Sequence, residues 1–273
     1  MGELLFVGMG LGDEQDLTLR AVDALRAADL VVAEQYTSRL APGSLERLER
    51  LIGKKVRELT REELESERPV LDALDRGDVV ALLVVGEPFA ATTHLSLRLS
   101  AEKRGYPWRI LHNASILTAA ASFAGLSLYR FGRVVSLPHP DTEGYQPTSP
   151  YEALAANVRA GLHSLVLLDI DAGRGRYLTA DVALRHLGEL EGRFHGGVAG
   201  PESLWCVVAR VGTPGARAWA GPRAELESLE FGEPLHSLIL PGPSLHFLEQ
   251  DALERWKVSP REKPSGVTGS SGP

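Results

Sequence analysis

Residues 4–20 read LLFVGMGLGDEQDLTLR, and this stretch decides the fold of the N-terminal half. Leu4–Val7 has the length and apolar composition of a buried strand. Glycines then alternate at Gly8, Gly10 and Gly12, acidic residues follow, and a helical pattern begins. Glycine accepts positive φ angles and lets other atoms approach the backbone closely. The pattern predicts either a turn that touches a small molecule or an ordinary turn at a strand end, and the loop alone favours neither.

The dinucleotide-binding fingerprint GxGxxG is the obvious alternative for this loop, but its spacing fails. Position 13, where the third glycine belongs, holds Asp13. The carboxylates of Asp13, Glu14 and Asp16 would also repel a pyrophosphate at the start of the helix. A P-loop is excluded because no GK[ST] follows. A sulfonium cofactor carries no phosphate, so an acidic loop does not repel it.

Size and charge set the class of protein. The chain has 273 residues, which suits one large α/β domain or two small ones. Its net charge of −7 argues against a general nucleic-acid binder. The single cysteine, Cys206, forms no intramolecular disulfide, which fits a reducing cytoplasm. No signal-peptide pattern opens the chain, and apolar runs such as Val79–Val85 are too short for a bilayer, so we expect a cytoplasmic protein without membrane contact.

Strand and helix patterns alternate from residue 1 to about residue 111, which predicts a mostly parallel sheet with crossover helices. The apolar run Val79–Val85 is typical of a central parallel strand and leads into the loop 86–94, GEPFAATTH. Ligands of such sheets bind outside the carboxyl ends of the strands, where this loop and the glycine loop both lie. One charged, solvent-facing helix is expected over Arg61–Arg76.

The C-terminal half has a different sequence pattern. Apolar strands are expected between helical patterns, over Leu162–Ile170, Leu204–Val211 and Leu235–Leu240. We therefore predict two α/β domains, residues 1–111 with the glycine loop and residues 112–262 with a mixed sheet. Residues 263–273 are rich in Gly and Ser and predict a disordered tail. No histidine or cysteine cluster has metal-ligand spacing, so no metal is expected.

Six segments follow one another in a fixed order: GMGLG at 8–12, YTS at 36–38, GEPFAATTH at 86–94, HNASI at 112–116, GLHSLVLLDI at 161–170 and PLHSLILPG at 234–242. Together they resemble the archaeal diphthine synthase family, which belongs to the tetrapyrrole-methylase-like class of S-adenosyl-L-methionine-dependent methyltransferases. The resemblance covers roughly residues 4–255. A strand followed by GxGxG is shared across the class, whereas ATTH, HNASI and GLHSLVLLDI are more specific.

The resemblance implies an enzyme of diphthamide biosynthesis. It implies two α/β domains with the cofactor in the cleft between them, and a homodimer. The reaction it implies is N-methylation of the 3-carboxy-3-aminopropyl group on a modified histidine of elongation factor 2, which gives diphthine and S-adenosyl-L-homocysteine. Two alternatives stay open at this point: a tetrapyrrole C-methyltransferase acting on a precorrin or uroporphyrinogen, and a non-catalytic binding module of the same fold.

The resemblance also implies which residues bind the cofactor: Leu11, Glu87, Ala90, Ser115, Ile116, Leu168, Val211 and His236. Glu87 is in addition the candidate catalytic residue, whose carboxylate would bind the donor or accept a proton. The alternative is a residue that only caps the next turn. The family usually has Asp at position 87 and a larger aliphatic residue at position 90. Tyr36 is a candidate substrate contact, although packing under the sheet is the more frequent role of such a tyrosine.

Overall fold

The computed structural model describes residues 2–34, 38, 40–141, 148–171 and 175–258, and it forms two compact units. The first unit comprises Met1–Ala119 with the short segments Ile170–Arg176 and Val211–Gly215. The second comprises Ala120–Asp169, Tyr177–Arg210 and Ala216–Pro273. The predictions for Tyr36 and for the tail 263–273 lie outside the described residues.

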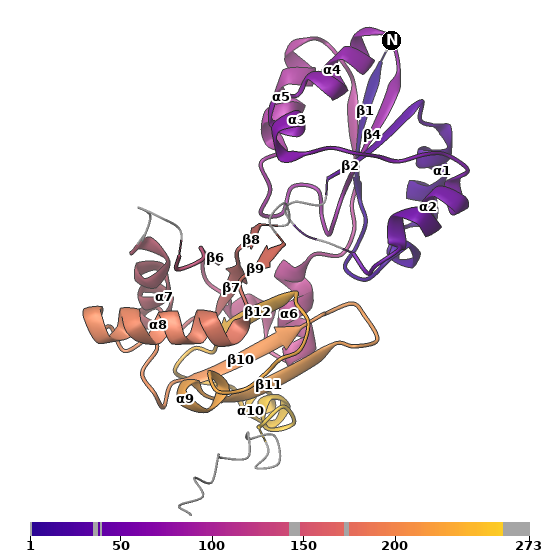
Figure 1. Ribbon diagram of the computed structural model, residues 1–273. Helices are drawn as coiled ribbons and strands as arrows, with labels where there is room; N and C mark the ends of the chain where they lie inside the picture. The colour runs from indigo at the N-terminus through magenta and orange to yellow at the C-terminus, as the bar shows by residue number, and fades with distance from the viewer. Residues whose placement is uncertain (1, 35–37, 39, 142–147, 172–174, 259–273) are drawn as a thin grey trace, which may run out of the picture. The chain divides into compact units, whose positions relative to one another are not determined.

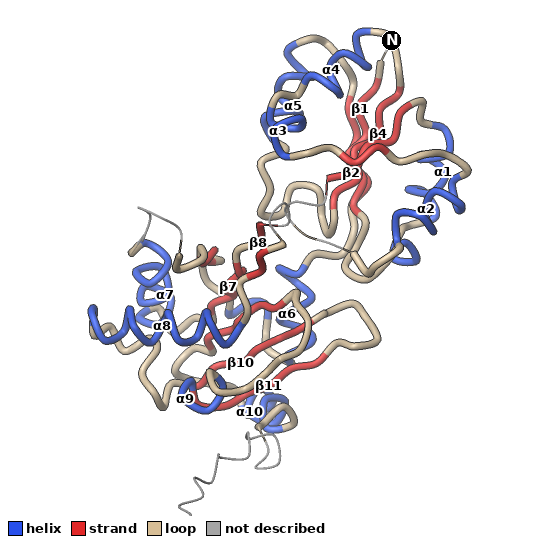
Figure 2. Tube along the Cα trace, in the orientation of Figure 1, coloured by secondary structure: helices blue, strands red, loops and turns tan. Residues whose placement is uncertain are grey.

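The first unit is built on a five-stranded parallel sheet in the order β3-β2-β4-β1-β5, which confirms the predicted parallel sheet. Figure 2 shows its strands in red. Their bounds are β1 Glu3–Gly8, β2 Leu30–Glu34, β3 Arg57–Glu58, β4 Val79–Val84 and β5 Trp108–Leu111. In register, Glu3–Gly8 runs beside Val79–Val84 from end to end. The carboxyl ends of β1 and β4 therefore lie next to each other.

Helices cover both faces of this sheet, with α1 and α2 on one face and α3, α4 and α5 on the other (Figure 1). Side chains of β1 alternate between the two cores: Leu5 and Val7 face α1 and α2, and Leu4 and Phe6 face the opposite helices. A strand buried on both faces must be apolar throughout. The helix bounds are α1 Leu19–Ala27, α2 Ser44–Ile52, α3 Arg61–Glu65, α4 Arg68–Asp75 and α5 Leu95–Lys103, with a short 3₁₀ turn η1 at Glu14–Asp16.

The single helix expected over Arg61–Arg76 is wrong, because two short helices, α3 and α4, occupy this stretch. Pro69 lies in the first turn of α4, where it cannot continue a preceding helix. Glu67 adopts φ 59°, and this left-handed conformation interrupts the helical path between α3 and α4. Nor do they face only solvent, since Leu64 of α3 and Leu74 of α4 are buried against the sheet.

The second unit holds a mixed five-stranded sheet in the order β11-β10-β12-β7-β6, as the sequence predicted. Only β6 and β7 pair in parallel; the other pairs are antiparallel. The strands are β6 Val135–Leu137, β7 Ser164–Leu168, β10 Leu204–Ala209, β11 Arg217–Pro222 and β12 His236–Leu240. Outside both five-stranded sheets, β8 (Ile170–Asp171) of the first unit pairs with β9 (Arg176–Tyr177).

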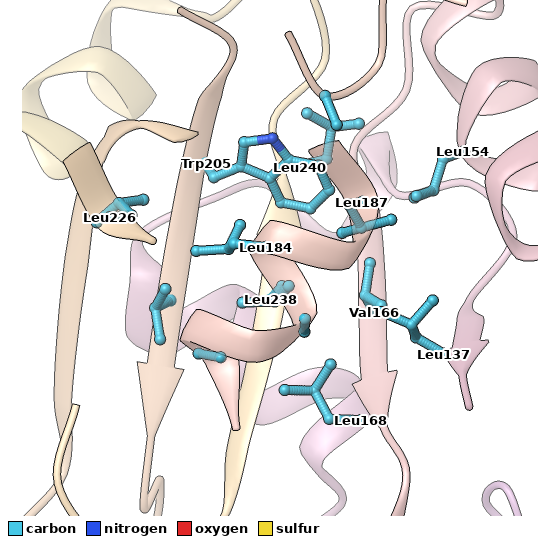
Figure 3. Close-up of a cluster of buried hydrophobic side chains, with 14 of the residues drawn as sticks. Leu137, Leu154, Val166, Leu168, Leu184, Leu187, Trp205, Leu226, Leu238 and Leu240 are labelled. Carbon is cyan, nitrogen blue, oxygen red and sulfur yellow. The ribbon is translucent and has the colours of Figure 1, made fainter. Parts of the chain in front are cut away.

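The core of the second unit gathers around Trp205 of β10, which is fully buried (Figure 3). Leu184 and Leu187 of the long helix α8 lie over the sheet in the same cluster. Cys206 is buried beside Trp205, as expected for a strand residue. The remaining helices are α6 Ile116–Ala124, α7 Ser149–Arg159, α8 Ala180–Phe194, α9 Arg223–Leu226 and α10 Phe247–Glu254, with a 3₁₀ turn η2 at Leu128–Arg130. None of the helices in the described part of the chain combines the length and apolar character needed to cross a membrane.

The two units divide the chain differently from the ranges 1–111 and 112–262 inferred from sequence. Residues 112–119 stay with the first unit, where the Asn113 side chain donates to the main-chain carbonyl of Gly8. Segment 211–215 also belongs to the first unit, because Gly212 packs against the backbone of the glycine loop. Both attachments are long-range contacts that local patterning does not reveal.

Candidate functional site

Two loops meet at the carboxyl edge of the parallel sheet. The chain leaves β1 toward α1 on one face and leaves adjacent β4 toward α5 on the other, so a topological switch point lies between them. Ligands of such sheets bind at this point. The loops are joined by a backbone bridge: the N–H of Gly86 donates to the carbonyl of Gly10 at 2.8 Å, and the reverse bond is 3.4 Å.

The alternating glycines let neighbouring loops approach. A Cβ at Gly8 would lie 2.7 Å from the carbonyl oxygen of Gly86. A Cβ at Gly12 would lie 2.5 Å from the carbonyl oxygen of Gly212. Gly10 adopts φ 76°, the left-handed region that glycine tolerates best. The GxGxG pattern is therefore explained by loop-to-loop packing that brings 211–215 beside the glycine loop.

Asp16 occupies the amide groups that a phosphate would seek. Its Oδ2 accepts from the backbone N–H of Leu11 at 3.0 Å and of Gly12 at 2.7 Å. A phosphate at this loop would have to displace a carboxylate and lie beside its negative charge. Thr18 caps α1, with its Oγ1 accepting from Ala21 N–H. The sequence identified Asp16 as a carboxylate that repels phosphate, but it did not reveal the hydrogen bonds of Asp16 to the loop.

Glu87 links the loop after β4 to the loop after β5. Its Oε1 lies 2.7 Å from Nδ1 of His112, and its Oε2 accepts from the backbone N–H of Asn113 at 2.9 Å. The Asn113 side chain in turn donates to the carbonyls of Gly8 at 2.9 Å and Asp16 at 3.0 Å. The Glu87 carboxylate therefore joins two loops and does not cap the turn that follows it, and its catalytic role stays a prediction. Asn113 was missed as a positioning residue, although it lies inside the HNASI motif.

The first unit brings six of the eight predicted cofactor residues to one edge. They lie on the loops after β1, β4 and β5, which are neighbours in the sheet, and on the segment that packs against the glycine loop: Leu11, Glu87, Ala90, Ser115, Ile116 and Val211. Ser115 also begins α6, because its Oγ accepts from the backbone N–H of Leu117 at 3.2 Å. Six of the predicted residues therefore lie at the edge where ligands of parallel sheets bind.

The other two predicted residues belong to the second unit. Leu168 ends β7 and His236 begins β12. These two strands are antiparallel neighbours with Leu167 opposite Ser237, so Leu168 and His236 lie at the same end of the paired strands. Burial lowers the pKa of His236. Its ring nitrogens are engaged, with Nδ1 accepting from Ala180 N–H and Nε2 facing the Glu233 carbonyl at 3.1 Å. Any ligand contact of His236 is thus expected through its backbone.

Known proteins resemble the chain over almost its whole length. The family model described as "Tetrapyrrole (Corrin/Porphyrin) Methylases" matches residues 3–227. A diphthine synthase of Methanothermobacter thermautotrophicus is 43% identical, with 94% of this chain and 97% of the relative covered. Another, from Methanocorpusculum labreanum, is 41% identical, with 93% and 98% covered. The chain belongs to the diphthine synthase group of the tetrapyrrole methylases. A crystal structure titled diphthine synthase superposes with a TM-score of 0.84 at 32% identity, covering 95% of this chain and 98% of that one.

These matches confirm the family, the fold class and the methyltransferase activity predicted from the sequence motifs. They do not favour a tetrapyrrole substrate, because the relatives that match nearly end to end are diphthine synthases. The eight cofactor residues and the catalytic role of Glu87 stay predictions. Across the described ranges, no group of three His, Cys, Asp or Glu side chains is arranged to hold a metal ion.

Proposed function

We propose that this chain transfers methyl groups from S-adenosyl-L-methionine to the amine of the 3-carboxy-3-aminopropyl group on a modified histidine of elongation factor 2. The product is diphthine, an intermediate of diphthamide biosynthesis. The observation that carries this proposal is the likeness to diphthine synthases over more than nine-tenths of the chain.

The glycine loop supports a sulfonium donor. The backbone N–H groups of Leu11 and Gly12 already donate to the Asp16 carboxylate. The loop therefore presents negative charge where a nucleotide-binding loop presents free N–H groups. We infer that Leu11, Ala90 and Val211 contact the donor mainly through apolar or main-chain atoms. Glu87, Ser115, Ile116, Leu168 and His236 complete the proposed set. The bound donor supplies an electrophilic methyl group that the amine nitrogen takes in an in-line displacement, leaving S-adenosyl-L-homocysteine.

The chain's task in this reaction is mainly positioning. An alkylamine has a pKa of roughly 10.4 in water, so it must lose a proton before its lone pair can attack. Removal from water favours the neutral amine, while a nearby carboxylate opposes that change and offers a proton acceptor. Glu87 is half-buried and holds the loops after β4 and β5 together. We propose that it positions the donor site and, as a second task, accepts the proton of the amine.

The decisive experiment is incubation of the full chain with methyl-labelled S-adenosyl-L-methionine and elongation factor 2 bearing the aminocarboxypropyl-histidine. Label should enter the modified histidine, and mass spectrometry should show a trimethylated product. The Leu11→Arg variant should lose donor binding, because a cationic side chain in the glycine loop repels a sulfonium. No label in the factor, or transfer to a uroporphyrinogen instead, would refute the proposed substrate.

Two coarser properties belong to the same proposal. We infer a homodimer from the resemblance to the family, which sedimentation of the purified chain measures directly. We also infer that the enzyme works in the cytoplasm, where its substrate protein acts in translation. A monomer that is fully active would refute the first inference.

A further inference from the structure

We propose that His94 is a positioning residue that holds the loop 86–94 in the shape that binds the methyl donor. This inference rests on the proposed function, since Glu87 and Ala90 of that loop are proposed donor contacts. His94 itself is not among the predicted cofactor residues. Its position at the end of the ATTH motif suggests nothing more specific than a structural histidine.

The loop needs a restraint because part of its backbone is in an unfavourable conformation. Ala91 adopts φ 59°, a left-handed conformation that residues with a Cβ rarely take. A backbone bond from Ala90 N–H to the Glu87 carbonyl closes the turn just before it. Phe89 anchors the same turn by packing on Phe6 of β1, with ring centroids 4.8 Å apart. The side chains after Ala91 must therefore hold the second half of the loop.

Two side chains tie that second half back to one carbonyl. Nδ1 of His94 lies 2.9 Å from the carbonyl oxygen of Pro88, and the Thr92 hydroxyl donates to the same oxygen at 2.7 Å. Both bonds span Ala90 and Ala91. His94 starts α5 without capping it through its side chain, so its ring is committed to the loop. The bonds fix the position of Ala90 relative to α5 and the sheet.

The position of His94 is itself strongly determined. The side chain is 2% exposed and lies beside Glu34, the fully buried last residue of β2, with Nε2 and Oε1 3.9 Å apart. A carbonyl oxygen can only accept, so Nδ1 carries hydrogen whether the ring is neutral or charged. Nε2 has no hydrogen-bond partner among the described residues. The contact that defines the ring's role is thus the Nδ1 bond to Pro88.

The two ring nitrogens allow a sharp substitution test. In His94→Asn the side-chain amide can place an N–H close to the position of Nδ1, whereas in His94→Gln it reaches toward Nε2. Gln resembles His more closely in size, so a role as a space-filler predicts that Gln is the better replacement. A role as the Nδ1 donor predicts that Asn is the better one.

The measurement is calorimetric titration of the full chain with S-adenosyl-L-homocysteine, the non-reactive product. We expect His94→Asn to bind within about threefold of wild type and His94→Gln to lose on the order of tenfold, the value of one net hydrogen bond. Thr92→Val should lose severalfold, and the neighbouring exposed residue in Thr93→Val should lose nothing. Wild-type affinity in His94→Gln, or an equal loss in His94→Asn, would overturn the proposal.

Hydrogen exchange in the free protein separates this inference from the proposed function. Peptides covering 86–94 should exchange faster in His94→Gln than in wild type or His94→Asn, with no ligand present. If wild type fails to bind the product, the proposed function fails, while the exchange data still decide whether His94 holds the loop. Equal exchange in all three proteins would refute the positioning role even if the product binds.

Discussion

Replacing Glu249 with Gln is expected to destabilise the second unit by about 3 kcal/mol at neutral pH. Glu249 lies in the first turn of α10 and is 3% exposed. Its carboxylate accepts from four donors: Ser127 N–H at 3.0 Å, the Arg130 guanidinium at 2.6 Å, His163 Nε2 at 3.1 Å and His246 N–H at 2.9 Å. These bonds attach α10 to the turn η2 and to the residue before β7. Gln keeps one acceptor oxygen and turns an N–H₂ toward these donors.

The magnitude follows from the pKa of the carboxyl group. Burial alone would raise the pKa of Glu249, but the N–H groups of His246 and Ser127 and the His163 side chain outweigh it and lower the pKa from 4.5 to about 2. Lowering the pKa from 4.5 to about 2 corresponds to about 3 kcal/mol. Because the folded-state pKa is the lower one, this stabilisation is complete above the unfolded value, about pH 4.5. It is lost as the pH falls toward 2.

Urea unfolding at pH 7 and pH 3 tests this reasoning. Three of the four tryptophans, Trp205, Trp219 and Trp256, lie in the second unit, so their fluorescence reports its unfolding. Glu254→Gln is the matched control on the same helix, because Glu254 is exposed and its carboxylate pairs with the exposed Lys257. Such an exposed pair is worth less than about 1 kcal/mol. The effect of Glu249→Gln should shrink to less than half at pH 3, and an effect that is small at pH 7 or unchanged at pH 3 would refute it.

Three further outcomes are expected. Gly12→Ala should lower stability by about 1–3 kcal/mol in thermal unfolding, since its Cβ meets the Gly212 carbonyl at 2.5 Å; Gly192→Ala, with nothing within 4 Å, should not destabilise. Burial raises the pKa of Cys206 to about 12, so the native protein should not react with a thiol reagent at pH 8, and rapid labelling would contradict its burial. Glu87→Ala should slow methyl transfer by more than about tenfold while circular dichroism stays unchanged, because the loops after β4 and β5 lose their link; wild-type turnover would leave Glu87 without a role in the reaction.

Much of the fold could be predicted from local patterns. The apolar run Leu4–Val7 and the run from Val79 are buried on both faces of a parallel sheet, and continuous apolar strands report that burial directly. The helix α2, Ser44–Ile52, buries Leu48 and Ile52, which are spaced four residues apart as on one face of a helix. The prediction failed where a local break interrupts a charged pattern, as at Glu67 and Pro69 between α3 and α4. It also missed β11, whose alternation is obscured by Gly221 and Pro222.

The candidate site shows a similar division. Loop positions after β1 and β4 follow from strand order and the rule that ligands bind at carboxyl ends. The bonds that join those loops do not follow from it. Glu87 meets Asn113, 26 residues away, and Asn113 reaches the Gly8 carbonyl 105 residues away. No pattern within one segment specifies either partner.

By itself, the sequence determined the class of protein: apolar periodicity determined alternating strands and helices, and six ordered motifs determined the family. Tertiary structure alone decided which hydrogen-bonding groups remain available. The Asp16 carboxylate accepts the hydrogen bonds of the Leu11 and Gly12 N–H groups, and the Pro88 carbonyl accepts the one from the His94 ring. Periodicity records which side of an element is buried, because burial repeats along the chain. A hydrogen bond between distant loops depends on the distance and direction of two particular atoms, and only the folded chain brings them together.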